Sequence, residues 1–190
     1  MITFVILIIK EMSKKTLVIH PDDRSTDFLK DIYVGKGWDV ISEPIKRRQL
    51  VNRIKEYDRI VMLGHGSPNG LFNIDASVRY NSPIYLIDSD LVWLLSQKEC
   101  IGVWCHANAF FDRHGLGPFA TGMVISEVSE ARYYGKTVTQ DEVDNSNMLI
   151  AKAFKECIDT PGFPHNLIDI YNGEGEVIKY NTEKLELDTY

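Results

Sequence analysis

Two short apolar runs, each leading into a residue that can do chemistry, constrain the fold of this chain most strongly. Residues 59–63 lead through a glycine into His65 and Gly66, and residues 101–104 lead directly into Cys105. Runs of this kind are typical of strands that are buried on both faces of a parallel sheet. The residues just after such strands face the crevice in which α/β proteins bind ligands. We therefore expect the imidazole of His65 and the thiol of Cys105 to meet there.

The rest of the chain alternates short apolar runs with helical periodicity. Further strands are predicted at residues 16–20, 38–41 and 122–126, and helices at residues 26–33, 45–57, 86–95 and 145–157. This alternation predicts an α/β fold: a single doubly wound domain, residues 16–190, with a mainly parallel sheet and helices on both faces. Residues 167–171 and 177–180 flank the sequence NGEG, which predicts a β-hairpin at the C-terminus.

The net charge and the cysteines of the chain bear on which partners it binds and where it works. A net charge of −6 argues against nucleic acid or an anionic membrane as a partner, because both favour a cationic surface. Three cysteines with no C-x-x-C pair are typical of reduced thiols, so we expect a cytoplasmic protein. Nothing in the composition specifies an oligomeric state.

Residues 1–15 are predicted to be an N-terminal extension or an extra strand. Residues 2–9 are strongly apolar, but eight residues are too few to span a bilayer. No basic segment precedes them, as a signal peptide would require. Met12 is an alternative to Met1 as the natural start.

The two motifs together resemble those of one group of enzymes. The segments GHGSPNGLF (residues 64–72) and IGVWCHANA (residues 101–109) are similar to the histidine and cysteine motifs of the caspase, legumain and gingipain group of cysteine peptidases. In that group one apolar strand ends in His-Gly and a later one delivers the nucleophilic cysteine. The resemblance implies a caspase-like sheet and a peptide or protein as substrate.

The resemblance also implies a role for each motif residue. Cys105 would be the nucleophile and His65 the general base, while the backbone N–H groups of Gly66 and Cys105 would form the oxyanion hole. A thiol with a pKa of about 8.5 is mostly protonated at neutral pH, so it needs a base beside it. This chemistry requires no metal and no cofactor.

Acidic and polar residues near the same crevice are candidates for a substrate pocket. Asp22 and Asp23 follow the first predicted strand, and Ser126 and Glu127 follow the strand predicted at residues 122–126. Acidic side chains in such a pocket would favour cleavage after a basic residue.

Two other functions remain open on the sequence. One is a caspase-like interaction module without catalysis. The other comes from the segment HPDD (residues 20–23), which resembles the metal-binding motif of zinc-dependent N-acetylglucosamine deacetylases. Arg24 stands where that family has glutamate, and a catalytic zinc needs three protein ligands, of which this segment supplies two, His20 and Asp23.

Overall fold

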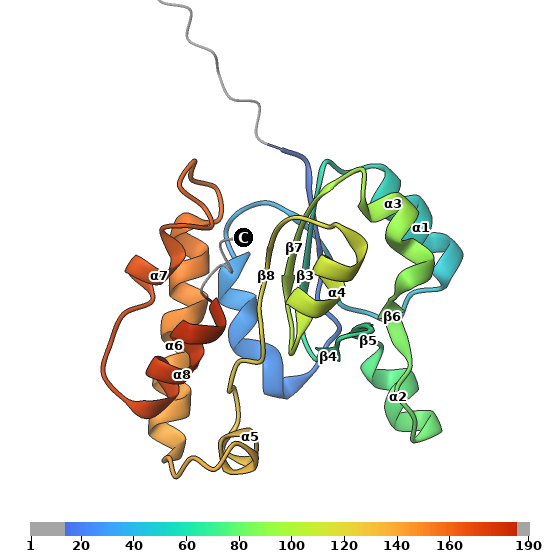
Figure 1. Cartoon of the computed structure of the whole chain (residues 1–190). Helices are drawn as coiled ribbons and strands as arrows, with labels where there is room; N and C mark the ends of the chain where they lie inside the picture. Colours follow the sequence, from blue (N-terminus) through green and yellow to red (C-terminus); the bar gives the residue numbers. More distant parts are fainter. Residues whose placement is uncertain (1–13, 186–190) are drawn as a thin grey trace, which may run out of the picture.

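A five-stranded parallel sheet forms the centre of the molecule (Figure 1). The computed structural model describes residues 14–185, so residues 1–13 of the predicted N-terminal extension, Met12 among them, lie outside the described residues. Across the sheet the strands follow the order β2 (Asp39–Ile41), β1 (Thr16–Ile19), β3 (Arg59–Leu63), β7 (Glu99–Val103) and β8 (Pro118–Ala120). The predicted α/β class with a parallel sheet is therefore confirmed.

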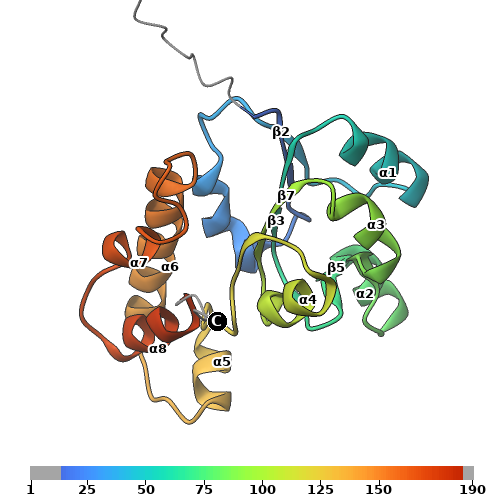
Figure 2. The same cartoon turned by 45° about the horizontal axis from the view of Figure 1, so that its top comes forward.

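Helices cover both faces of this sheet (Figures 1 and 2). One face packs against α1 (Arg47–Lys55), α3 (Val92–Leu95) and α4 (Ala107–His114), and the other against the 3₁₀ helix η1 (Arg24–Ile32) and α6 (Gln140–Cys157). Successive strand residues point to opposite faces, so Leu17 belongs to one core and Val18 to the other. Among residues 14–185, no helix combines the length and apolar character needed to cross a membrane.

A small antiparallel sheet is inserted between β3 and β7. Its strands, in order, are β4 (Gly66–Ser67), β5 (Gly70–Phe72) and β6 (Tyr85–Ile87). The short helices α2 (Ile74–Tyr80) and η2 (Ser89–Leu91) belong to the same insertion. The helix predicted at residues 86–95 is therefore shorter than expected, because its first residues pair with β5 as a strand.

The predicted C-terminal β-hairpin is wrong. Residues 167–185 form α7 (Leu167–Ile170) and α8 (Glu176–Leu185) instead. The β-branched residues at 177 and 178 favour a strand locally, but Val177, Asn181 and Leu185 are buried at the four-residue spacing of a helix face. Packing of that face outweighs the local preference.

The strand predicted at residues 122–126 is also wrong, because the fifth parallel strand is β8, a few residues earlier. The side chain of Asn181 explains the difference. Its Oδ1 accepts a hydrogen bond from the Ile125 amide at 2.7 Å, and its Nδ2 donates to the Ile125 carbonyl at 2.9 Å. A side chain of α8 thus satisfies the backbone groups that a neighbouring strand would otherwise pair.

Candidate active site at the carboxyl ends of β3 and β7

His65 and Cys105 follow two strands that lie side by side. β3 and β7 pair in parallel with Leu63 opposite Val103, and the Gly64 amide donates to the Val103 carbonyl at 3.1 Å. The strand pairing ends there, two residues before His65 and Cys105. The two residues therefore follow adjacent strands at the same, carboxyl edge of the sheet, as the sequence predicts.

The two motifs are also in direct contact. A Cβ on Gly66 would lie 2.2 Å from Cδ1 of Trp104, so only glycine fits against this indole. The indole Nε1 of Trp104 in turn donates to the Ser67 carbonyl at 3.1 Å. Trp104 precedes the cysteine, so this packing joins the loop after β3 to the loop after β7.

A small cavity connects the two candidate catalytic residues. His65, Cys105 and Ser126 all line it, together with apolar side chains from η1, β7 and α6. Its volume is about 20 Å³, which is roughly the space of one water molecule. The crevice is therefore formed but closed in this conformation.

The thiol of Cys105 is partly buried and contacts a carboxylate. Its Sγ donates to Oε1 of Glu130 at 3.9 Å. Burial raises the pKa of the Cys105 thiol to about 12, and the negative charge of Glu130 acts in the same direction. The thiol is therefore protonated at neutral pH in this conformation.

Glu130 is held in place by the start of its own helix, α5 (Val128–Tyr133). Its Oε2 accepts hydrogen bonds from the Ser126 amide at 2.8 Å, the Ser126 hydroxyl at 3.1 Å and the Glu127 amide at 3.2 Å. This reciprocal capping arrangement leaves Oε1 free to accept from Cys105.

His65 contacts a different set of polar groups. Its Nε2 lies 2.7 Å from Oγ of Ser25, and the Ser25 hydroxyl lies 2.7 Å from Oδ1 of Asp23. Among the described residues, no hydrogen bond joins His65 to Cys105. The ring and the thiol share a cavity while each bonds to its own partner.

The backbone turns sharply just after the cysteine. His106 has a φ of 62°, in the left-handed region, and is the N-cap of α4. This conformation costs a residue with a side chain about 1–2 kcal/mol, and such strain tends to occur at functional sites. The turn places Cys105 immediately before the N-cap of α4. The oxyanion role of the Gly66 and Cys105 N–H groups stays a prediction.

The predicted pocket residues divide between several locations. Ser126 lines the same cavity as the thiol, whereas Glu127 caps α5 and accepts from the Ser129 hydroxyl. Asp23 reaches the site through Ser25. Asp22 points elsewhere: it pairs with Lys30 at 3.1 Å and lines a separate cavity of about 140 Å³.

His20 of the HPDD segment is buried and fully hydrogen-bonded. Its Nδ1 lies 3.1 Å from the Tyr33 hydroxyl and its Nε2 3.1 Å from the Thr26 hydroxyl. Burial lowers the pKa of His20 to about 4, and the positive charge of Lys30 adds to the effect. Both ring nitrogens are engaged, and within residues 14–185 no three His, Cys, Asp or Glu side chains are grouped to hold a metal.

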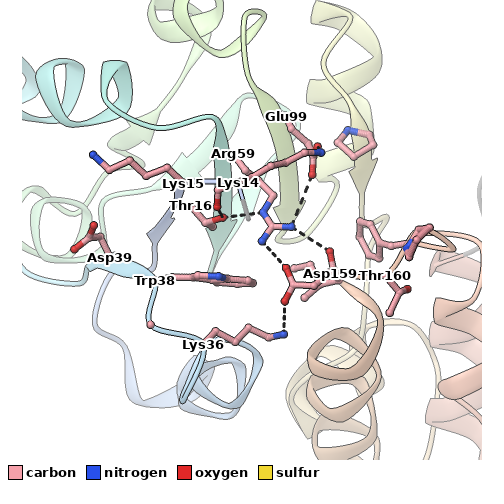
Figure 3. Close-up of a pocket in the computed structure, with 15 residues that line it drawn as sticks. Lys14, Lys15, Thr16, Lys36, Trp38, Asp39, Arg59, Glu99, Asp159 and Thr160 are labelled. Carbon is pink, nitrogen blue, oxygen red and sulfur yellow. Dashed lines mark hydrogen bonds and ion pairs between the residues drawn. The ribbon is translucent and has the colours of Figure 1, made fainter. Parts of the chain in front are cut away.

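A larger cavity, of about 900 Å³, lies at the opposite end of the sheet (Figure 3). Arg59 is buried beside it, stacks over Trp38 with 4.7 Å between the guanidinium carbon and the ring centre, and pairs with Asp159 at 2.6 Å. Lys36 pairs with the same carboxylate at 2.6 Å. These charges neutralise one another, and α/β folds bind ligands at the other end of the strands.

Sequence reasoning missed Ser25 and Glu130. Glu130 could have been found from the spacing of Glu127 and Glu130, which fits a capping box at the start of a helix. No local signal links Ser25 to His65, because the contact joins residues forty positions apart.

No model of a known protein family matches this chain, and no curated protein matches it either. Its function is therefore inferred from the geometry of the site.

Proposed function

We propose that the protein is a cysteine-type hydrolase that cleaves peptide bonds, with Cys105 as nucleophile and His65 as general base. The observation that supports this proposal is the parallel pairing of β3 with β7, the adjacent strands that His65 and Cys105 follow. Both then line the same cavity. Proximity of this kind is the first requirement for nucleophilic catalysis by a thiol.

The proposed reaction has two steps. In the first, the thiol proton moves to the His65 imidazole while Sγ of Cys105 attacks the peptide carbonyl carbon. The N–H groups of Gly66 and Cys105 stabilise the oxyanion. The imidazolium then protonates the leaving amine as the C–N bond breaks, giving a thioester. In the second step, water gives a proton to His65 and attacks the thioester, which releases the carboxylic acid and restores the thiol.

Substrate binding must change the resting site. The cavity beside Cys105 holds about one water molecule, so a peptide has to widen it. Glu130 must also leave the thiol, because its charge opposes the thiolate. Two acidic side chains next to the site, Asp23 beside Ser25 and Glu130 beside the Cys105 thiol, support a preference for peptides with a basic residue before the cleaved bond.

Labelling with peptidyl electrophiles tests the proposal. A panel of peptidyl acyloxymethyl ketones with different terminal residues is incubated with the purified protein, and the modified residue is located by mass spectrometry. We expect labelling of Cys105 that depends on the peptide, together with hydrolysis of the matching fluorogenic peptide. Cys105→Ala should abolish both, whereas Cys100→Ala, at a fully buried thiol, should retain them. Folded wild-type protein that reacts no better than Cys105→Ala would overturn the proposal.

A second candidate is a non-catalytic interaction module of the same architecture. Two observations favour it: the closed cavity and the contact between the Cys105 thiol and Glu130. The same labelling experiment distinguishes the two functions, because a non-catalytic module would show neither peptide-dependent labelling nor turnover.

A further inference from the structure

We infer that Ser25 and Asp23 are positioning residues that fix which nitrogen of His65 carries the proton. This inference rests on the proposed function. It starts from a chain of two short hydrogen bonds, 2.7 Å from His65 Nε2 to Ser25 Oγ and 2.7 Å from Ser25 Oγ to Asp23 Oδ1. Both distances are typical of well-formed hydrogen bonds.

The direction of each bond follows from the charge of Asp23. Although burial acts the other way, hydrogen bonds from the hydroxyl and amide of Ser25 hold the pKa of Asp23 below its ordinary value. The ionised carboxylate can only accept, so the single hydroxyl proton of Ser25 points to Asp23. Oγ of Ser25 must then accept from His65, which requires the proton of the neutral ring to be on Nε2.

This tautomer leaves Nδ1 of His65 as the basic nitrogen. Among the described residues, Nδ1 has no hydrogen-bond partner, so its lone pair is available for the proton of the Cys105 thiol. Once Nδ1 accepts that proton, the ring is a cation. The negative charge of Asp23, two hydrogen bonds away, stabilises the cation as the reaction forms it.

The fold explains why these residues reach the imidazole. β1 pairs with β3 in parallel, so the chain leaving β1 runs beside the chain leaving β3. Asp23 is the N-cap of η1, and its Oδ1 also accepts from the Ser25 amide at 2.8 Å. The bond from the Ser25 amide thus holds the carboxylate in place beside the Ser25 hydroxyl, so the residue that caps η1 also contributes to the candidate site.

The tautomer can be observed directly by nitrogen NMR. In protein carrying ¹⁵N-labelled histidine at pH 8, we expect the His65 ring to show a protonated Nε2 and an unprotonated Nδ1. Ser25→Ala removes the acceptor, so its His65 signals should shift toward a mixture of both tautomers. Ser25→Thr keeps a hydroxyl and should preserve the wild-type pattern. A protonated Nδ1 in the wild type would overturn the inference without any need for a variant.

Kinetics test whether this positioning serves catalysis. With the best peptide from the labelling panel, Ser25→Ala should lower kcat by about 100-fold with little change in KM. The reason is that part of the His65 population carries its proton on the wrong nitrogen, whereas substrate binding is unaffected. Ser25→Thr should recover most of kcat. Ser96→Ala, at an exposed serine that ends α3 just before the amino end of β7, should match the wild type. An unchanged kcat in folded Ser25→Ala would overturn the inference. A fixed tautomer in a protein without turnover would instead overturn the proposed function.

Discussion

Burial and the neighbouring carboxylate of Glu130 both oppose ionisation of the Cys105 thiol, and together they raise its pKa to about 12. Glu130→Gln removes the charge but leaves the burial. We expect the variant to react with iodoacetamide roughly tenfold faster than the wild type at pH 8, the increase in thiolate produced by lowering the pKa by about one unit. Mass spectrometry gives the rate for each cysteine separately.

Cys100 is an internal control in the same experiment. Burial also raises its pKa to about 12, but its sulfur contacts the Leu95 carbonyl rather than Glu130. Its rate should therefore be the same in both proteins. Equal rates at Cys105 would contradict the proposed effect of Glu130.

The lowered pKa of the buried His20 should make the stability of the protein depend on pH. Its pKa is about 4 in the folded protein and about 6.5 when unfolded, so between these values only the unfolded state binds the proton. Stability is fully present above pH 6.5 and falls as the pH drops toward 4, by up to about 3 kcal/mol. Urea denaturation at a series of pH values measures the loss.

The matched variants for this measurement are His20→Gln and His165→Gln. The first removes the buried titrating group and should flatten the profile between pH 6.5 and 4. The second removes an exposed histidine and should leave the slope unchanged. The lowered pKa values of Asp23 and Asp159 act in a more acidic window, below their ordinary value of 3.8. A slope that survives His20→Gln would assign the effect to another group.

At the scale of elements, the contact between the two motif loops depends on Gly66. An added Cβ would lie 2.2 Å from the Trp104 indole and 2.6 Å from the Gly70 carbonyl, closer than atoms can approach. We expect Gly66→Ala to cost about 1–3 kcal/mol of stability and to lower activity by displacing His65. Thermal denaturation and peptide hydrolysis measure the two effects.

Gly117→Ala is the control for that substitution, because nothing lies within 4 Å of a Cβ built there. It should change the melting temperature little. If Gly66→Ala proved equally mild, the loop after β3 would have to be free to move away from Trp104.

The elements that could be predicted are those whose sequence pattern matches their surroundings. β3 and β7 are buried on both faces, and their continuous apolar runs indicate this burial. The positions of His65 and Cys105, just after the two strands, could therefore be predicted. The absence of a strand at residues 122–126 could not be predicted, because Asn181 takes the place of a strand neighbour from fifty-six residues away in the sequence. Ser25 and Glu130 were missed for the same reason: both act through partners distant in sequence.

At the scale of the whole molecule, Arg59 connects separate elements at the end of the sheet opposite the candidate site. This buried guanidinium donates to the Thr16 hydroxyl at 3.0 Å, the Ile158 carbonyl at 3.2 Å and Asp159 at 2.6 Å, which joins β1 and β3 to the end of α6. Arg59→Ala removes this donor from the Thr16 hydroxyl and the Ile158 carbonyl, and it removes one of the two cations that pair with Asp159. The variant should cost about 3 kcal/mol in urea denaturation.

Arg48→Ala, at an exposed arginine of α1, is the control and should cost little. The folded fraction of Arg59→Ala should label at Cys105 as the wild type does, because the network lies at the amino end of the strands (Figure 3). Loss of labelling in folded protein would mean that the two ends of the sheet are coupled.

The fluorescence of Trp104 can report whether the closed crevice opens. The ring is buried against the histidine loop, whereas Trp93 is 55% exposed on α3 and Trp38 lies at the far end of the sheet. With Trp38 and Trp93 replaced by phenylalanine, the intrinsic emission would come from Trp104 alone. A ligand that separates the loop after β3 from the loop after β7 would expose this indole to water. The emission maximum would then shift to the red, even before any bond is cleaved.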